Sequence, residues 1–191
     1  MRNIEKMNSF NDGNRTLIES AVIPELAWAL KDWKKETEQA ACVLIGGQAV
    51  SHWCKPRSTM DLDFAFVSDA DIPTQVEGFK RTRDHAFLHR ETHVEIEVLT
   101  SSFLKISPVL IKKALATSVL SSGVQIACPE ALICLKCYRW SLQDRADIES
   151  LMKYLGNNAV GDVRNWASSV RDAFSKEAME HLNSVLLNEG H

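Results

Sequence analysis

Residues 41–67, ACVLIGGQAVSHWCKPRSTMDLDFAFV, contain the pattern that decides the fold. The first five residues are an apolar run that predicts a short buried strand, and this run stops at the pair Gly46-Gly47. Residues 48–54 predict a helix, after which a polar loop leads to residues 60–67. There aspartates alternate with apolar residues, which is the pattern of a strand with one buried face. A strand, a glycine turn, a helix and a second strand therefore form the expected centre of the fold.

Further strands and helices are expected around this centre. Alternation predicts a strand within residues 92–100, and residues 85–90 and 124–129 predict two shorter ones. Helical spacing of apolar residues runs through residues 15–39, returns over residues 107–117 and resumes from Pro129. Strands and helices without regular alternation predict an α+β fold, with a small mixed β-sheet core and flanking N-terminal and C-terminal helices.

The chain divides into three segments on this interpretation. We expect a helical lead over residues 1–40, the mixed core over residues 41–128 and a helical segment over residues 129–191. The last segment is expected to pack on the core, so that the three form one structural unit.

Composition and charge exclude several classes of protein. With 22 basic and 25 acidic residues among 191, the net charge of −3 gives no general footprint for duplex nucleic acid. No apolar run approaches the roughly 20 residues of a membrane-spanning helix, and the polar first residues lack the apolar core of a signal peptide. We expect a cytoplasmic protein with no membrane partner.

The cysteines and histidines do not form a recognisable zinc motif. Five cysteines, an odd number, lie mostly in apolar surroundings, which indicates reduced and buried thiols. Cys134 and Cys137 form a CxxC pair, but a zinc site needs two more ligands and no second pair follows at a suitable spacing. We interpret both as small core residues.

The glycine pair and the aspartate strand carry the first chemical signals. Gly46 and Gly47 allow backbone N–H groups to approach a ligand, and the start of the next helix favours a phosphate. The alternative is a tight turn that only needs a positive φ. Asp61 and Asp63 share one face of their strand, where their repulsion would be offset by a divalent cation such as Mg²⁺. The alternative there is a strand with a solvated acidic face.

A second pair of acidic residues strengthens the interpretation as a metal site. Glu95 and Glu97 share one face of another apolar strand. If the two strands are neighbours, three or four carboxylates converge. Such a cluster can hold two metal ions and deprotonate a hydroxyl nucleophile.

Residues 43–66, VLIGGQAVSHWCKPRSTMDLDFAF, resemble the signature of the polymerase-β-type nucleotidyltransferase superfamily. That signature is a glycine turn, about a dozen residues and a DxD strand, followed by a third carboxylate on a later strand. The sequence RSTMDLD over residues 57–63 resembles more closely the small bacterial AbiEii-type group, which is linked to abortive infection and toxin–antitoxin systems. HVEIEVLT resembles the third-carboxylate strand, with Glu97 in the expected place and Glu95 as the alternative.

The resemblance implies a nucleotidyltransferase that depends on Mg²⁺ or Mn²⁺. It would transfer a nucleoside monophosphate from a nucleoside triphosphate to an acceptor hydroxyl of a tRNA, a protein or a small molecule. It would act as a toxin, with an antitoxin protein as partner. The implied catalytic and metal-binding residues are Asp61, Asp63 and Glu97. The implied nucleotide-binding residues are Gly46, Gly47, Arg57, Thr59 and Lys136, with Thr59 also expected to orient the aspartates by a hydrogen bond.

The stretch LKCYRWSLQDRADIESL resembles the late helix pair of the same family. Lys136 and Arg139 share a helical face, and the resemblance implies that such a basic residue faces the active site and contacts phosphate. Asp144, Arg145 and Asp147 are expected to form a salt-bridge network that holds the helix pair to the core. Two alternatives stay open: a catalytically inactive nucleotide-binding or protein-interaction module on the same scaffold, and a carboxylate-rich phosphohydrolase.

Overall fold

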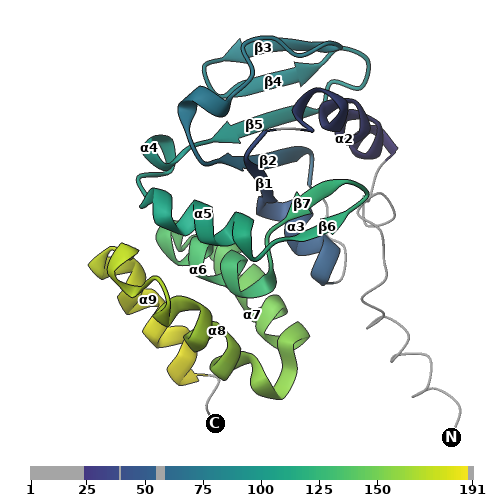
Figure 1. Cartoon of the computed structure of the whole chain (residues 1–191). Helices are drawn as coiled ribbons and strands as arrows, with labels where there is room; N and C mark the ends of the chain where they lie inside the picture. Colours follow the sequence, from purple (N-terminus) through teal and green to yellow (C-terminus); the bar gives the residue numbers. More distant parts are fainter. Residues whose placement is uncertain (1–23, 39, 55–58, 189–191) are drawn as a thin grey trace, which may run out of the picture.

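A seven-stranded mixed sheet forms the centre of the computed structural model, which describes residues 24–38, 40–54 and 59–188 (Figure 1). The order of strands across the sheet is β3-β4-β5-β2-β1-β7-β6. The strands are β1 (Cys42–Ile45), β2 (Asp61–Phe66), β3 (Phe79–Arg83), β4 (Ala86–His89), β5 (Glu95–Leu99), β6 (Val119–Ser121) and β7 (Val124–Ile126). The pairings of β2 with β5 and of β1 with β7 are parallel, and the others are antiparallel. The α+β fold class is confirmed.

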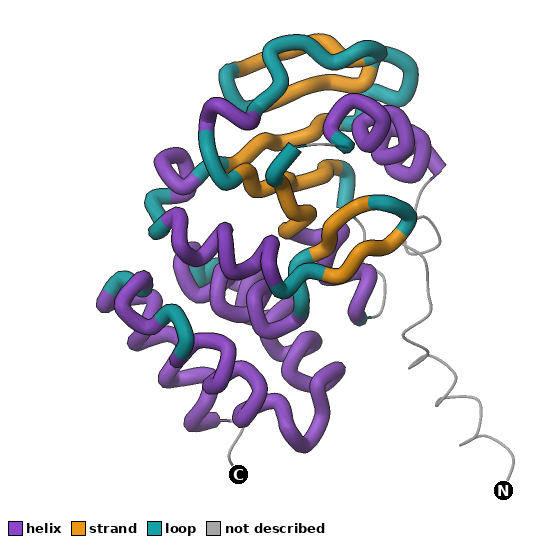
Figure 2. Tube along the Cα trace, viewed as in Figure 1, coloured by secondary structure: helices purple, strands orange, loops and turns teal. Residues whose placement is uncertain are grey.

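Helices pack against this sheet, and Figure 2 shows most of them gathered below the strands in that view. The helices are α2 (Pro24–Thr37), α3 (Gly46–Trp53), α4 (Ser101–Leu104), α5 (Pro108–Ala116), α6 (Pro129–Arg139), α7 (Leu142–Leu155), α8 (Ala159–Ser168) and α9 (Lys176–Asn188). Single 3₁₀ turns are η2 (Asp69–Asp71), η3 (Gly156–Asn158) and η4 (Arg171–Ala173). α6 contacts α3 and α5 as well as α7, α8 and α9, so the C-terminal helices are joined to the core mainly through α6.

The segment that decides the fold forms the elements expected from its sequence. β1 is buried along its whole length and pairs antiparallel with β2, with Leu44 opposite Phe64 and Ile45 opposite Asp63. α3 begins directly after β1, at Gly46, and contacts both strands. The strand, the helix and the second strand therefore meet at the glycine turn.

The sheet has one strongly apolar face, which α2 covers. The fully buried indole of Trp33 packs against rings from three strands, with centroid distances of 5.8 Å to Phe64, 5.5 Å to Phe79 and 5.3 Å to Phe87. Because successive side chains point to opposite faces of a strand, Asp63 lies on the face away from Phe64. Packing of α2 on the apolar face thus leaves the carboxylates on the other face.

Two strands, β3 and β6, are missing from the sequence-based expectation. Both are the outermost strands of the sheet. β3 has the sequence FKRTR and exposes four of its five residues, so it shows no apolar alternation. Charged side chains on an edge strand also discourage pairing with another chain. β6 has three residues and buries none of them, so it too shows no apolar alternation, unlike the equally short β7.

The two cysteines of the CxxC pair lie in the core, as expected. Cys134 and Cys137 are fully buried on α6, and both are free thiols. Burial raises the pKa of the Cys137 thiol to about 12, so it stays protonated at neutral pH.

No helix within the described residues combines the length and the apolar character that crossing a bilayer demands.

Candidate active site

The turn from β1 into α3 places a glycine directly against Asp63. Gly46 has a φ of +69° and is the first residue of α3. A Cβ atom added to Gly46 would lie 1.7 Å from Oδ2 of Asp63 and 2.5 Å from its Cγ. Only glycine leaves room for the carboxylate, which therefore lies at the N-terminal end of the helix. Ile45, the N-cap residue, provides no side-chain hydrogen bond to the first turn.

The register of two parallel strands brings the four acidic residues together. On β2 and β5, Asp61 is paired with Glu95 and Asp63 with Glu97. Neighbouring strands lie about 4.8 Å apart, and paired residues point to the same face. The acidic residues that the sequence places on two separate strands therefore form one patch, with Asp63 beside the glycine turn.

The environment of Asp63 is strongly unfavourable to a negative charge. Burial raises the pKa of the Asp63 carboxyl to about 7, and the charges of Asp61 and Glu97 add to this rise. The cations Lys136 and Arg139 are near enough to oppose it. A carboxyl with such a raised pKa beside other carboxylates is typical of a functional site.

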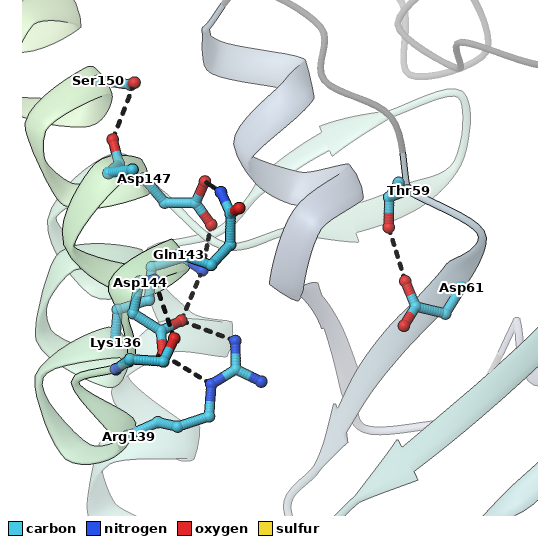
Figure 3. A network of polar contacts seen from close by, with 10 residues as sticks. Thr59, Asp61, Lys136, Arg139, Gln143, Asp144, Asp147 and Ser150 are labelled. Carbon is cyan, nitrogen blue, oxygen red and sulfur yellow. Dashed lines mark hydrogen bonds and ion pairs between the residues drawn. The ribbon is translucent and has the colours of Figure 1, made fainter.

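Thr59 makes the orienting contact that the sequence predicts. Its hydroxyl donates a hydrogen bond of 2.6 Å to Oδ1 of Asp61, just before β2 begins (Figure 3). Thr59 is buried, whereas Asp61 is exposed. The direction of the Asp61 carboxylate is thereby fixed. Arg57, the other residue predicted from this loop, lies outside the described residues.

Arg83 of β3 holds the acidic residues of β5. Its guanidinium is ion-paired with Glu95, and its Nη2 lies 3.6 Å from Oε1 of Glu97. All three side chains are partly exposed, at 62 % for Arg83 and about a third for each glutamate. The two candidate third carboxylates therefore share one counter-ion.

The acidic patch has the donors for a divalent cation, although its side chains do not converge. Among the described residues, no three His, Cys, Asp or Glu side chains are placed to hold a metal ion. The contact of Arg83 with Glu97 directs this carboxylate to another partner. Residue types and register nevertheless fit Mg²⁺ or Mn²⁺, which prefer carboxylate oxygens. A cation would also offset the repulsion that raises the pKa of Asp63.

A buried ionic network on α6 and α7 lies near Asp63. The ammonium of Lys136, only 7 % exposed, donates to Asp144 at 3.2 Å and to Asp147 at 2.7 Å (Figure 3). Gln143 donates to the second oxygen of Asp147 at 2.9 Å. The guanidinium of Arg139 donates hydrogen bonds to both carboxylate oxygens of Asp144, at 2.6 and 2.7 Å. Asp144 and Asp147 therefore take part in a salt-bridge network, as predicted, and these ion pairs join α6 to α7.

One member of the predicted network is wrong. Arg145 is exposed on α7, and Arg139 supplies the guanidinium that binds Asp144. The residue after Asp144 points outward because α7 starts with a capping box, in which the Ser141 hydroxyl and the Asp144 carboxylate each accept a backbone N–H of the other residue. This cap turns Asp144 back toward the end of α6, where Arg139 lies.

The pKa of Asp144 reflects this surrounding. Burial alone would raise the pKa of the carboxyl. Hydrogen bonds from Arg139 and Ser141, together with the charge of Lys136, outweigh burial and hold the pKa well below its usual range. Asp144 therefore stays ionised and keeps both cations in place.

The structure changes what Lys136 and Arg139 are able to contact. Lys136 is enclosed and already neutralised by two aspartates, and the phosphate contact expected of it stays a prediction. Arg139 is 70 % exposed, so the part of its guanidinium away from Asp144 faces solvent. It is the accessible cation of this network near Asp63.

From the sequence, Arg83 is interpreted as part of a solvated basic loop, with a phosphate or nucleic-acid contact as the alternative, and its contact with Glu95 and Glu97 is not foreseen. It lies in a run of basic residues, KRTR, that has the composition of a solvated loop. No local pattern in the sequence shows that this run is an edge strand two strands away from the third carboxylate.

Comparison with known proteins gives little that bears on function. No protein-family model matches the chain, and no curated protein matches it. A similar solved structure is the crystal structure of an antigenic nucleotidyltransferase-like protein from Paracoccidioides brasiliensis, with a TM-score of 0.49 and 18 % sequence identity. The similarity covers 85 % of this chain and 91 % of that chain. A similarity of this size assigns neither a family nor an activity, so a function for this protein has to rest on its own side chains.

Proposed function

We propose that this protein is a metal-dependent nucleotidyltransferase of the AbiEii-type group. It would transfer a nucleoside monophosphate from a nucleoside triphosphate to an acceptor hydroxyl. The observation that carries the proposal is the register of β2 and β5, which sets Asp63 beside Glu97, and Asp61 beside Glu95, with Asp63 at the glycine start of α3. A sheet with a solvated acidic face would not need to bury Asp63 against this turn.

Asp61, Asp63 and Glu97 would hold Mg²⁺ or Mn²⁺. When bound, the metal would supply the positive charge that stabilises the phosphates and the leaving pyrophosphate. The hydrogen bond from Thr59 keeps the Asp61 carboxylate in one orientation before any ligand arrives. Such pre-organisation lowers the cost of binding.

The remaining polar groups suit the binding of a triphosphate. The first turn of α3, with Gly46 and Gly47, presents backbone N–H groups that can donate to phosphate oxygens. Arg139 is exposed and fixed in direction by Asp144, which suits paired hydrogen bonds to a phosphate. Lys136 would act indirectly, by holding Asp144 and Asp147 in place. Arg57 is proposed as a further phosphate contact.

Glu97 would accept the proton of the acceptor hydroxyl as this attacks the α-phosphorus. A carboxylate serves as a base only when it is free to approach the hydroxyl. Glu95, which is bound more closely by Arg83, is the alternative for this role. The acceptor is proposed as a hydroxyl of a tRNA, a protein or a small molecule, and an antitoxin protein as the partner that restrains the activity.

A label-transfer experiment tests the proposal. The protein is incubated with α-³²P-labelled nucleoside triphosphates and Mg²⁺, alone and with a fractionated cell extract that separates RNA, protein and small molecules. We expect label in one acceptor fraction. Asp61→Ala should lower the rate of label transfer at least about 100-fold, because it removes a proposed metal ligand. Asp162→Asn, an exposed aspartate on α8, is the matched control and should keep full activity.

Two results would overturn the proposal. Release of inorganic phosphate without label in any acceptor indicates a phosphohydrolase. Absence of transfer, together with an unchanged melting temperature on addition of Mg²⁺ and nucleotide, indicates an inactive module.

A further inference from the structure

The acidic patch continues across the sheet into basic residues of the edge strand. Asp63 on β2 is paired with Glu97 on β5, which is paired with Ala86 on β4. Ala86 in turn is paired with Arg83 on β3. Since paired residues share a face, these four positions form one row that begins with two carboxylates and ends with a guanidinium.

An irregularity in β3 places Arg83 in this row. The pairing of β3 with β4 shifts between Arg81 and Arg83, so that Arg81 is opposite Phe87 but Arg83, rather than Thr82, is opposite Ala86. Without this bulge Arg83 would miss the row by one residue and point to the other face of the sheet. Bulges commonly redirect a side chain next to a functional site.

The residue between Arg83 and the glutamates is small. Ala86 is buried and its methyl group does not block the path across β4. The long side chain of Arg83 therefore reaches Glu95 and Glu97 two strands away, while Arg81, on the other face, lies 5.6 Å from the centroid of the Phe87 ring. The two arginines of the same strand thus have separate environments.

We propose that Arg83 is a positioning residue that couples the binding of the metal to the binding of the nucleotide. In the free protein its ion pairs with Glu95 and Glu97 partly neutralise these carboxylates, so that a cation alone binds weakly. The triphosphate offers Arg83 a stronger partner, because guanidinium and phosphate form paired hydrogen bonds. Glu97 is then released to complete the metal site. This inference rests on the proposed function of the acidic patch.

The ion pair of Arg83 with the glutamates is weak enough to be replaced by a contact of Arg83 with phosphate. Arg83 is largely exposed, and exposed ion pairs are weak enough to break without destabilising the fold. The positive charge of Arg83 also opposes a cation bound nearby. Its removal should therefore favour the metal and disfavour the phosphates.

Binding measurements on the full chain test this coupling. The probe is Mn²⁺, followed by the electron paramagnetic resonance signal of the free ion, with wild type, Arg83→Gln and Arg83→Lys. Arg81→Gln is the matched control, because it removes the same charge from the same strand on the opposite face. Binding of a non-hydrolysable nucleotide analogue is then measured at saturating Mn²⁺. Melting temperatures establish that each variant is folded.

We expect Arg83→Gln to bind Mn²⁺ alone about three- to fivefold more tightly than wild type, and the analogue less tightly by a similar factor. Arg83→Lys keeps the charge but not the paired donors, so both of its affinities should lie between those of wild type and Arg83→Gln. Arg81→Gln should match wild type in both measurements. A merely structural role for Arg83 would not move the two affinities in opposite directions.

Asp61→Asn separates the failure of this inference from the failure of the proposed function. If Mn²⁺ binding depends on Asp61 but Arg83→Gln behaves like Arg81→Gln, the coupling is refuted and the metal site stands. If Asp61→Asn binds Mn²⁺ as wild type does, the acidic patch is not a metal site and both proposals fall.

Discussion

Substitution of Gly46 by alanine tests the closest contact in the candidate site. Gly46 combines a φ of +69° with the approach of Asp63, whose Oδ2, Cγ and Cβ would lie 1.7, 2.5 and 2.8 Å from the added Cβ. Normal contacts between such atoms begin at about 3.5 Å. The carboxylate would therefore have to move by well over an ångström, away from the start of α3.

Two costs add up in Gly46→Ala. A non-glycine residue at positive φ costs of the order of 1–3 kcal/mol, and forcing extra atoms into a packed site adds about 1–3 kcal/mol. Gly156→Ala is the matched control, since Gly156 has the same φ of +69° but no atom within 4 Å of an added Cβ. The two variants differ in whether the added methyl group has space.

The assay is urea unfolding at pH 7, followed by far-UV circular dichroism. We expect Gly46→Ala to lose about 1–3 kcal/mol more unfolding free energy than Gly156→Ala. In the background of Asp63→Ala, which lacks Oδ2 and Cγ, most of this excess should vanish, although the Cβ contact at 2.8 Å remains. Equal losses in the two glycine variants, or no relief from Asp63→Ala, would refute the close packing of Asp63 against the turn.

Three further predictions concern the same region. Because the pKa of Asp63 is raised to about 7, the folded state binds a proton that the unfolded state releases near pH 4, so the wild-type unfolding free energy should fall by about 2–3 kcal/mol from pH 5 to pH 8 in EDTA. In Asp63→Asn, the unfolding free energy should not show this fall with pH. The same pH dependence in wild type and Asp63→Asn would contradict the raised pKa of Asp63. Lys136→Met removes the buried cation shared by Asp144 and Asp147, leaving Asp144 with Arg139 alone, and should lose about 3–5 kcal/mol in urea unfolding, whereas Lys153→Met, at an exposed pair, should lose at most about 1 kcal/mol. Thr59→Val should weaken Mn²⁺ binding by about fivefold through loss of the hydrogen bond to Asp61, with Thr59→Ser near wild type; equal affinities of Val and Ser variants would argue against an orienting role.

The local part of the site could be predicted from the sequence. The apolar run before Gly46 and the alternation around Asp61 and Asp63 specify two strands and a helix within 27 residues. Periodicity and glycine turns act over such short distances, so they leave a visible pattern. The same holds for the face shared by Glu95 and Glu97 within β5.

The pairing between distant strands could not be predicted in this way. No local pattern specifies that β5 lies parallel to β2, with Glu97 opposite Asp63. The contact of Arg83 with Glu95 and Glu97 could not be predicted, because its position depends on an edge strand and on a bulge in it. A lysine is by default expected on the surface, and only the packing of α6 against α7 shows that the side chain of Lys136 is buried.

The parallel pairing of β2 with β5 has a consequence for how the protein folds. The two strands are separated by residues 67–94, and this long loop must close before their carboxylates meet. The antiparallel neighbours β3, β4 and β5 are joined by short turns, so contacts among them have lower contact order and should form earlier. The acidic patch is therefore assembled late, and a nascent chain that already contains the DxD motif has not yet acquired the patch. During synthesis, the proposed activity would then require at least that β5 has been made and has paired with β2.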